Sequence, residues 1–438
     1  MKEVDQMKMT KGASAATQKY MADGIRYVCE NFKERSPGSH SERKAQKYLK
    51  SELEKWADKV EMEDFSVHPA AFMGWIPAAA VIGMLAVLFY WLTYTGAASG
   101  PGLAIVSTVI VLFALACLVF EFLMYREFVD FLFPRKTSRN VMARRAPKGE
   151  VKRRIIFGGH TDAANEWTYS LHGGIKSLAP VMGGSIGGLI AVVIFDVVWL
   201  VYAFTGGNYE SNFWLVCGII QLVLVPFFIA ICFFINWKVV VDGANDNLTA
   251  DFIAMGVIKE MAENDIRFEN TEVCALLSGS EEAGIRGALA YAKAHKEELE
   301  NVETVFIAMD TMREIEQLQI YTQGCTGTQK NSNAVAEIIY EAGVNCGIEM
   351  KETEIYPGAI DAEAFSRLGL LASGFCGVNH DPKTYYHTRL DTADNISEEC
   401  INLSLDICLE AAKLYDEKGG IDAFREDGKK RFKRGHNN

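Results

Sequence analysis

Two adjacent glutamates, Glu281 and Glu282, stand between an apolar run and a glycine in the stretch LLSGSEEAG. On a helix surface such a pair is ordinarily solvated charge. The preceding TEVCALL is β-branched and apolar, which predicts a buried strand and places the pair at its carboxyl end. In open α/β sheets this edge is where ligands bind, so the pair is a candidate for chemistry.

Further acids and histidines follow strand-like runs. RRIIFGG leads into His160 and VETVFIA leads toward Asp310, while His387 lies in the polar loop YYHTRLDT. Asp246 precedes an amphipathic helical pattern, where a helix N-cap is the alternative. A two-metal site needs a bridging carboxylate, plus one histidine and one further carboxylate for each ion. These residues suffice, and one glutamate of the pair is left over as a general base.

The ordered motifs GGHTD, GANDN, SGSEEAG, AMD and YYHTRLDTADNI resemble the co-catalytic di-zinc metallopeptidase family of aminopeptidases and glutamate carboxypeptidases. The resemblance implies an α/β fold, with a mixed central β-sheet sandwiched by helices. It also implies a zinc-dependent exopeptidase, a hydrolase expected to act as an aminopeptidase on peptide substrates. A minority of the family act as cyclases. For this chain a carboxypeptidase, a deacylase and an inactive receptor or scaffold remain alternatives, and the intact set of site residues argues against the inactive form.

Carried over residue by residue, the family pattern gives His160 and Asp310 to one zinc ion, Glu282 and His387 to the other, and Asp246 to both as a bridge. Glu281 becomes the general base for a metal-activated water. Asp162 would accept the second ring N–H of His160. Tyr386 would stabilise the oxyanion, although Tyr385 competes for that position and a packing role is the alternative. The implied cofactors are two Zn²⁺ ions, with Co²⁺ or Mn²⁺ as tolerated replacements.

Hydrophobic residues make up 49% of the chain, and much of this excess lies in four long apolar stretches, at 75–95, 103–125, 178–204 and 213–237. Each is close to the roughly 20 residues that cross a bilayer. Buried core helices are the alternative, but helices of globular domains rarely stay apolar for so long. The stretches predict two inserted transmembrane hairpins and a multi-pass protein, and such hairpins can associate into a homo-oligomer. Asp196, at mid-span, is expected to be paired or functional.

Charge near the stretches predicts their orientation. The hairpin tips GAASGPG and TGGNYES contain no Lys or Arg, whereas Arg126, Lys176 and Lys238 lie near the other ends. By the positive-inside rule, the catalytic domain and both termini are cytoplasmic. The ten cysteines show no CxxC spacing, which agrees with a reducing compartment. A net charge of −12 argues against nucleic-acid binding.

The resulting domain division alternates catalytic and membrane segments. Residues 1–72, 126–177 and 238–425 form the peptidase domain, 73–125 and 178–237 form the two hairpins, and 426–438 is a basic tail. The strand that ends at His160 falls in the middle segment of the peptidase domain. The tail contains KKRFKR, which is a solvated end or a contact to anionic lipid.

Overall fold

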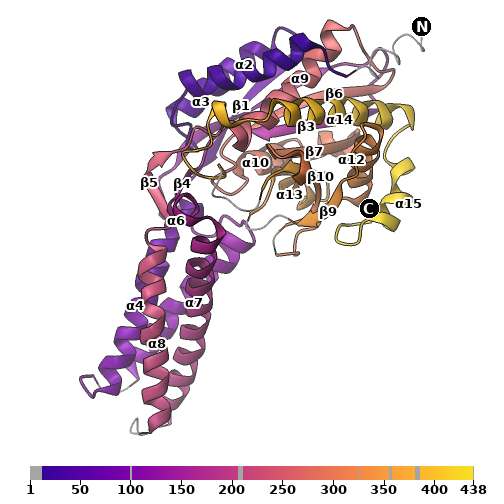
Figure 1. Ribbon diagram of the computed structural model, residues 1–438. Helices are drawn as coiled ribbons and strands as arrows, with labels where there is room; N and C mark the ends of the chain where they lie inside the picture. Colours follow the sequence, from indigo (N-terminus) through magenta and orange to yellow (C-terminus); the bar gives the residue numbers. More distant parts are fainter. Residues whose placement is uncertain are drawn as a thin grey trace. The chain divides into compact units, whose positions relative to one another are not determined.

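The computed structural model describes residues 12–98, 101–205, 211–324, 326–354, 358–379 and 385–437. The chain divides into two compact units. The α/β unit comprises Met1–Pro69, Arg135–Glu166 and Lys238–Asn438, and the helical unit comprises Ala70–Pro134 and Trp167–Trp237. Figure 1 labels elements of both units, among them β3 and α7. Parts of both predicted hairpin tips, at 99–100 and 206–210, fall outside the described residues.

An eight-stranded sheet with the order β1-β2-β6-β3-β7-β10-β8-β9 forms the centre of the α/β unit. Its strands are β1 (Lys59–Val67), β2 (Lys136–Arg145), β3 (Arg153–His160), β6 (Thr271–Ser278), β7 (Glu303–Met312), β8 (Gln319–Gln323), β9 (Lys351–Glu354) and β10 (Leu371–Gly377). The four central strands β6, β3, β7 and β10 run parallel, while β2 and β8 pair antiparallel with β6 and β10 at the two sides of this set. The sheet is therefore mixed, as the sequence predicts.

The central strands are apolar on both faces because helices cover both. In β3, Ile155 and Phe157 join the main core, and Ile156 points to the opposite face, yet all three are fully buried. The parallel register brings the carboxyl ends together, with His160 opposite Ser278. Polar residues that follow these strands consequently meet at one edge of the sheet.

Helices cover the two faces of the sheet unequally. The larger core lies under α2 (Ala15–Asn31), α3 (His40–Leu53), α9 (Thr249–Glu263), α12 (Asn333–Asn345) and α14 (Glu398–Glu417), and α9 contacts three of the central strands. The other face carries α10 (Arg286–Ala294), α11 (Lys296–Asn301) and α13 (Asp361–Ser366), and α15 (Asp422–Arg431) packs on α12. Mixed sheet and flanking helices confirm the predicted fold class.

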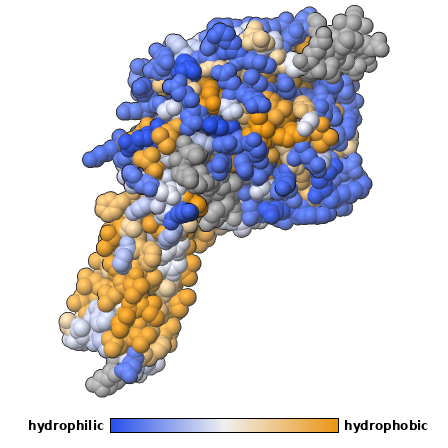
Figure 2. Space-filling model, in the orientation of Figure 1, coloured by the Kyte–Doolittle hydropathy of each residue, from blue (hydrophilic) through white to orange (hydrophobic). Residues whose placement is uncertain are grey.

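The helical unit is built from α4 (Ala71–Tyr94), α5 (Gly102–Ala116), α7 (Ile175–Phe204) and α8 (Asn212–Ile231), with the short α6 (Thr168–Gly173) before α7. A π-helical segment, Cys117–Leu123, extends α5. All four long helices have the length and apolar composition needed to cross a membrane. Their outward side chains are largely apolar, which Figure 2 shows as an orange surface.

The fourth apolar stretch is shorter than predicted. Its helix ends at Ile231, and Ile235–Val240 forms strand β5, which pairs with β4 (Asn165–Trp167) in a small two-stranded sheet. The sequence INWKVV is rich in β-branched residues, and pairing with β4 satisfies backbone groups that a longer helix would otherwise satisfy. The prediction of one apolar helix through to Trp237 was therefore wrong at its end.

Close helix packing in the helical unit depends on small residues. The ring of Phe228 lies against Gly83 of α4 and Gly188 of α7, and a Cβ at Gly83 would stand 3.0 Å from that ring. Small residues let helices approach closely where lipid offers no hydrophobic drive to association. The mid-span acid is paired, because Ser107 Oγ donates to Asp196 Oδ2 at 2.5 Å.

Candidate metal centre

The first group of candidate ligands is drawn from two strand ends and one loop. His160 is the last residue of β3 and is 2% exposed. Its Nε2 lies 3.2 Å from Asp246 Oδ1 and 4.0 Å from Asp310 Oδ2. One ligand atom from each residue lies within 4.8 Å of the other two, so the three could hold a metal ion.

A second group shares Asp246 with the first. His387 Nε2 lies 2.9 Å from Asp246 Oδ2 and 3.2 Å from Glu282 Oε1. Both of these carboxylate oxygens are buried, and neither has a hydrogen-bond partner among the described residues. Buried charged oxygens without hydrogen bonds are costly unless they are paired or bind a metal. These oxygens and the imidazole nitrogen therefore suit a cation, and Asp246 offers one oxygen to each group.

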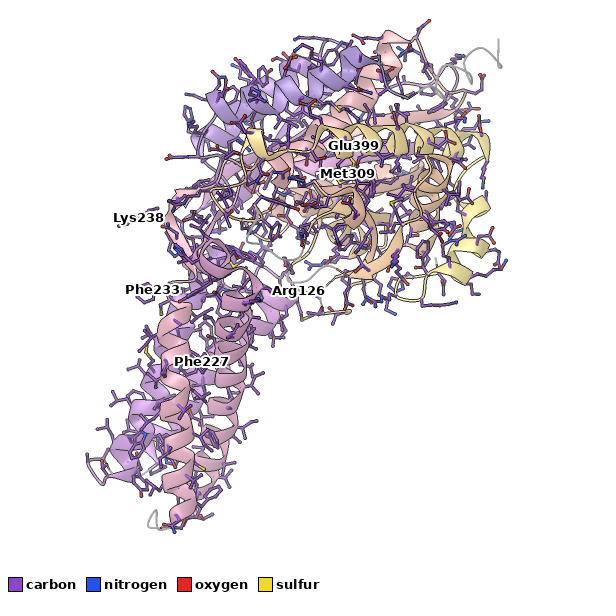
Figure 3. All side chains as sticks on the ribbon, in the orientation of Figure 1. Arg126, Phe227, Phe233, Lys238, Met309 and Glu399 are labelled. Carbon is purple, nitrogen blue, oxygen red and sulfur yellow. The ribbon has the colours of Figure 1, made fainter. Side chains whose placement is uncertain are left out.

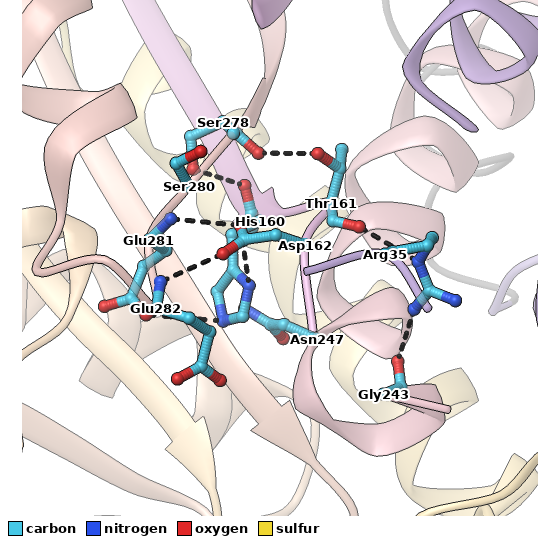
Figure 4. A network of polar contacts seen from close by, with 12 residues as sticks. Arg35, His160, Thr161, Asp162, Gly243, Asn247, Ser278, Ser280, Glu281 and Glu282 are labelled. Carbon is cyan, nitrogen blue, oxygen red and sulfur yellow. Dashed lines mark hydrogen bonds and ion pairs between the residues drawn. The ribbon is translucent and has the colours of Figure 1, made fainter. Parts of the chain in front are cut away.

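Glu281 belongs to a third group of possible ligands, because its carboxylate lies within 4.8 Å of ligand atoms of His160 and Glu282. Its Oε2 is 3.8 Å from His160 Nε2. Asp162 fixes the turn, since its two carboxylate oxygens accept the backbone N–H groups of Glu281 and Glu282, each at 3.0 Å (Figure 4). The contact predicted between Asp162 and the His160 ring has a Nδ1–Oδ1 distance of 3.6 Å, longer than a hydrogen bond. In this structure Asp162 orients the glutamate pair more directly than it orients the imidazole.

The glutamate turn needs a glycine because neighbouring backbone lies so close. A Cβ at Gly279 would come within 2.4 Å of the Arg139 carbonyl oxygen. The next residue, Ser280, has φ +53°, in the left-handed region that few non-glycine residues adopt. Thr311 and His387 share this conformation, both with φ +50°. Three unusual backbone positions thus lie in or next to candidate site residues, a clustering typical of functional sites.

The Asp246 loop is held from two directions. Asp391 accepts hydrogen bonds from the backbone N–H of Asn245 at 2.7 Å and of Asp246 at 3.1 Å. Asn247 reaches the end of β7, where its side chain accepts from Thr311 N and donates to Met309 O. The bridging position is therefore fixed relative to Asp310 by its own neighbours.

Arg35, before α3, ties two of the site loops together (Figure 4). It is 1% exposed, and its guanidinium donates to the carbonyl oxygens of Thr161, Asp242 and Gly243 at 2.8–3.2 Å. Thr161 follows His160, and Gly243 begins the turn into Asp246. One buried cation thus positions candidate ligands that lie far apart in the sequence.

Glu42 of α3 supports the glutamate turn from behind. Its carboxylate accepts from the backbone N–H groups of Ser280 and Gly38, each at 2.8 Å, and from the Ser138 hydroxyl at 2.7 Å. Burial, followed by the nearby charge of Asp162, raises the pKa of Glu42 to about 8. Glu42 and Asp162 therefore both accept hydrogen bonds from the backbone of the glutamate turn.

The centre as a whole has an excess of buried negative charge. Burial and the neighbouring Asp246 raise the pKa of Asp310 to about 7. Burial lowers the pKa of His387, but Glu282 and Asp246 outweigh burial and raise it to about 10. Imidazoles and carboxylates in such surroundings are suited to divalent cations, which would supply the missing positive charge.

The two candidate tyrosines differ in their surroundings. The Tyr386 ring stacks on His387, with ring centroids 4.1 Å apart. Tyr385 is 1% exposed, and its hydroxyl oxygen accepts a hydrogen bond from Asn379 N at 3.0 Å. Tyr386 is therefore the tyrosine that contacts a candidate ligand, and Tyr385 packs in the fold.

The sequence pattern of Peptidase family M28 matches residues 233–412. The predicted family resemblance is confirmed. The matched segment includes the glutamate pair and the candidate ligands Asp246, Asp310 and His387, while His160 precedes it. This M28 match supports a metallopeptidase that carries a site of histidines and acids. No curated protein sequence matches the chain.

Solved structures share the fold of this chain at low sequence identity. An aminopeptidase from Aneurinibacillus sp. strain AM-1 is 14% identical with a TM-score of 0.53, over 93% of this chain and 95% of that one. The LapA aminopeptidase of Legionella pneumophila is 9% identical with a TM-score of 0.51, over 95% and 75% of the two chains. A glutaminyl cyclase from an Acidobacteriales bacterium is 12% identical with a TM-score of 0.51, over 93% and 98%.

All of the predicted ligands meet at one edge of the sheet. The residues that hold them there were not predicted as site residues: Arg35, Glu42, Asn247 and Asp391. Asn247 and Asp391 lie within the motifs GANDN and YYHTRLDTADNI, so their positions were a usable signal. Arg35 and Glu42 occur in a charged amphipathic region, where nothing distinguishes them from surface residues.

Proposed function

We propose that this chain is a membrane-bound di-zinc peptidase that acts as an aminopeptidase. The observation that carries the proposal is the pair of ligand groups, His160 with Asp246 and Asp310, and Glu282 with Asp246 and His387. A carboxylate shared between two histidine-containing groups is what a two-metal site requires. Zinc ions bound there would polarise the scissile carbonyl and make water more acidic.

Glu281 is proposed as the general base. It lies beside both ligand groups, and Asp162 fixes its backbone. It would take a proton from the attacking water and deliver that proton to the leaving amine. Tyr386, stacked on His387, would donate a hydrogen bond to the oxyanion. Asp162 would act through the glutamate pair and through its electrostatic contact with His160.

The helical unit supports a multi-pass membrane protein. Between 28% and 39% of the apolar window in each long helix is buried within the protein, so most of each window faces outward. An apolar exterior of this kind is stable in lipid and unfavourable in water. The cytoplasmic orientation and the homo-oligomer remain predictions from the sequence.

Two neighbouring substitutions test the assignment within the glutamate pair. Full-length protein purified in detergent with added zinc is incubated with a mixed peptide library, and products are identified by mass spectrometry. Glu281→Gln should keep two zinc ions per chain and lose about 10²–10⁴-fold in rate. Glu282→Gln should lose zinc, measured by inductively coupled plasma mass spectrometry. Equal zinc loss in both variants would contradict the division of roles.

The products separate the aminopeptidase from its alternatives. Removal of single N-terminal residues would support the aminopeptidase. Removal of C-terminal residues or acyl groups would indicate the same hydrolytic chemistry on another class of substrate. Because glutaminyl cyclases share the fold, peptides with N-terminal glutamine belong in the library. Loss of ammonia from them, without peptide cleavage, would favour a cyclase. Two zinc ions in wild type with no product of any kind would favour the scaffold.

A further inference from the structure

A short turn after the second long helix of the helical unit presents two apolar side chains to the outside. The 3-10 turn Asp130–Leu132 follows the π-helical end of α5, and within it Phe131 is 76% exposed and Leu132 is 59% exposed. No other large apolar side chain in the described part of the chain has an exposed fraction as high as that of Phe131. Burying a side chain of this size contributes about 1.5–3 kcal/mol, so a fixed pair of them left in water is unfavourable.

The turn is held on both sides by contacts within the helical unit. Before it, the buried carboxylate of Glu121 accepts from the backbone N–H groups of Phe128 at 2.9 Å and Val129 at 3.0 Å, and Val129 is 1% exposed. After it, the Phe133 ring packs on α4, where a Cβ at Gly74 would stand 2.7 Å from that ring. The outward direction of the two apolar side chains is therefore built into the fold.

The segment that carries the turn continues the apolar exterior of α5. The Phe128 ring lies 6.2 Å from the ring of Phe113 and 5.3 Å from the ring of Phe120, measured between centroids, and both of these outer rings are more than 40% exposed. Arg126, just before this segment, and Phe233, which is 62% exposed, mark the same end of the helical unit in Figure 3. Exposed apolar side chains thus extend from the long helices to this end.

We propose that Phe131 and Leu132 insert into the interfacial layer of the bilayer, which makes the turn a membrane contact outside the four long helices. The inference rests on the membrane part of the proposed function, because those helices bring the turn to the bilayer. Irregular backbone exposed to lipid does not occur within the hydrocarbon region. The turn therefore lies at the level of the headgroups, where aromatic side chains are enriched, and only its apolar side chains reach the acyl chains.

Charge does not select the lipid at this contact. Exposed Arg126 is followed by exposed Glu127, and Asp130 belongs to the turn itself. Side chains of both signs thus adjoin the apolar pair, and burial of apolar area is the driving force. Insertion should be the same in zwitterionic and in anionic bilayers.

Electron paramagnetic resonance of the full chain in dioleoyl phosphatidylcholine nanodiscs tests the contact. A nitroxide label on Leu132→Cys is compared with labels on two exposed reference positions, Val223→Cys in α8 for the membrane and Lys19→Cys in α2 for water. Labelled wild type corrects for the native cysteines. The ratio of collision rates with oxygen and with a water-soluble nickel complex should be severalfold higher at Leu132 than at Lys19, and lower than at Val223. Replacing half of the lipid by phosphatidylglycerol should leave the ratio unchanged.

A second measurement keeps an aromatic ring at the turn, in case the labelled variant fails to fold. The fluorescence added by Phe131→Trp, obtained as the difference from wild type, should be quenched more by phosphatidylcholine brominated near the headgroup than by lipid brominated near the chain end.

Three results would overturn the contact. They are a Leu132 label with the ratio of Lys19, a label that collides with neither reagent because protein covers it, and an unquenched Phe131→Trp. A ratio that rises only with phosphatidylglycerol would overturn its apolar basis. If the Val223 label also has the ratio of Lys19, the membrane part of the proposed function fails together with this inference, which separates the two failures.

Discussion

Buried acidic side chains make different kinds of contact in the two units of this protein. In the α/β unit the surface is largely hydrophilic (Figure 2), and buried acids such as Glu42, Asp162 and Asp391 each accept two or more hydrogen bonds. In the helical unit the exterior is apolar, with Val109 and Val201 more than 60% exposed, and Asp196 accepts one short bond from a serine hydroxyl. Glu121, which is also fully buried in the helical unit, accepts from the backbone N–H groups of Phe128 and Val129, only seven and eight residues later. Buried acids therefore connect distant loops around the candidate site in the first unit, and a helix pair or a local turn in the second.

The largest effect is expected at the residue shared by both ligand groups. Asp246→Asn removes charge from both groups, so the loss in kcat/KM should exceed the roughly 10²–10⁴-fold expected from loss of a general base. Zinc content should fall from two ions per chain, measured by inductively coupled plasma mass spectrometry. Asp242→Asn, four residues earlier in the same loop, is the control and should keep both zinc ions. Full activity in Asp246→Asn would remove the basis for a two-metal site.

Asp162→Asn should have an intermediate effect. The amide that replaces the carboxylate has one oxygen, so only one of the Glu281 and Glu282 backbone N–H groups keeps its acceptor. Activity should fall about 10–100-fold, as for other residues that orient metal ligands. Most of the loss should appear in kcat, with zinc content close to that of wild type. A loss of zinc as large as in Asp246→Asn would instead make Asp162 a ligand.

Glu42→Gln should produce a pH-dependent change in stability. The folded pKa is about 8, and the unfolded pKa is about 4.3. Between these values the folded state keeps a proton that the unfolded state releases, so the contribution of Glu42 is full in acid and is lost as pH rises. The apparent Tm of wild type relative to Glu42→Gln should fall from pH ~5 to pH ~8. Glu54→Gln, at the exposed end of the same helix, is the surface control. An opposite slope would mean that Glu42 is charged in the folded protein.

The smallest effect is expected in the helical unit. Asp196→Asn keeps a hydrogen-bond acceptor for Ser107, and polar contacts between membrane helices contribute about 0.6 kcal/mol on average. Stability should change by less than about 1 kcal/mol, and peptidase activity should stay within about twofold. Thermal unfolding and the peptide assay measure the two quantities. A large loss of activity would show that the helical unit takes part in catalysis, which would break the contrast between the units.

The site residues could be predicted from the sequence because the patterns that identify them lie in short, continuous stretches of the chain. Apolar strand-like runs followed by His160, Glu281 or Asp310 report both the strand and its carboxyl end, and parallel pairing then brings these ends together. The long apolar stretches can also be recognised in the continuous sequence. The last helix is nevertheless shorter than predicted, because the β-branched segment at 235–240 forms strand β5. Patterns that depend on neighbours in the chain are visible without tertiary structure.

The supporting residues could not be predicted in the same way. Arg35 acquires its role from three carbonyl oxygens of distant loops, and Glu42 acquires its role from Gly38, Ser138 and Ser280. Neither residue type nor spacing distinguishes such a residue from a solvated one. The Arg35 and Glu42 side chains become buried and hydrogen-bonded only in the folded tertiary structure.

The pairing of β1 with β2 has a practical consequence for engineering. Val67 and Lys136 are direct partners in an antiparallel ladder, although 68 residues separate them. The second insertion is closed in a comparable way, because Val241 N donates to Ala164 O at 3.0 Å. Each apolar hairpin is thus, topologically, an oversized loop between chain segments that are already bonded to each other. Short turns grafted across these two closures would yield a water-soluble peptidase with its metal centre intact.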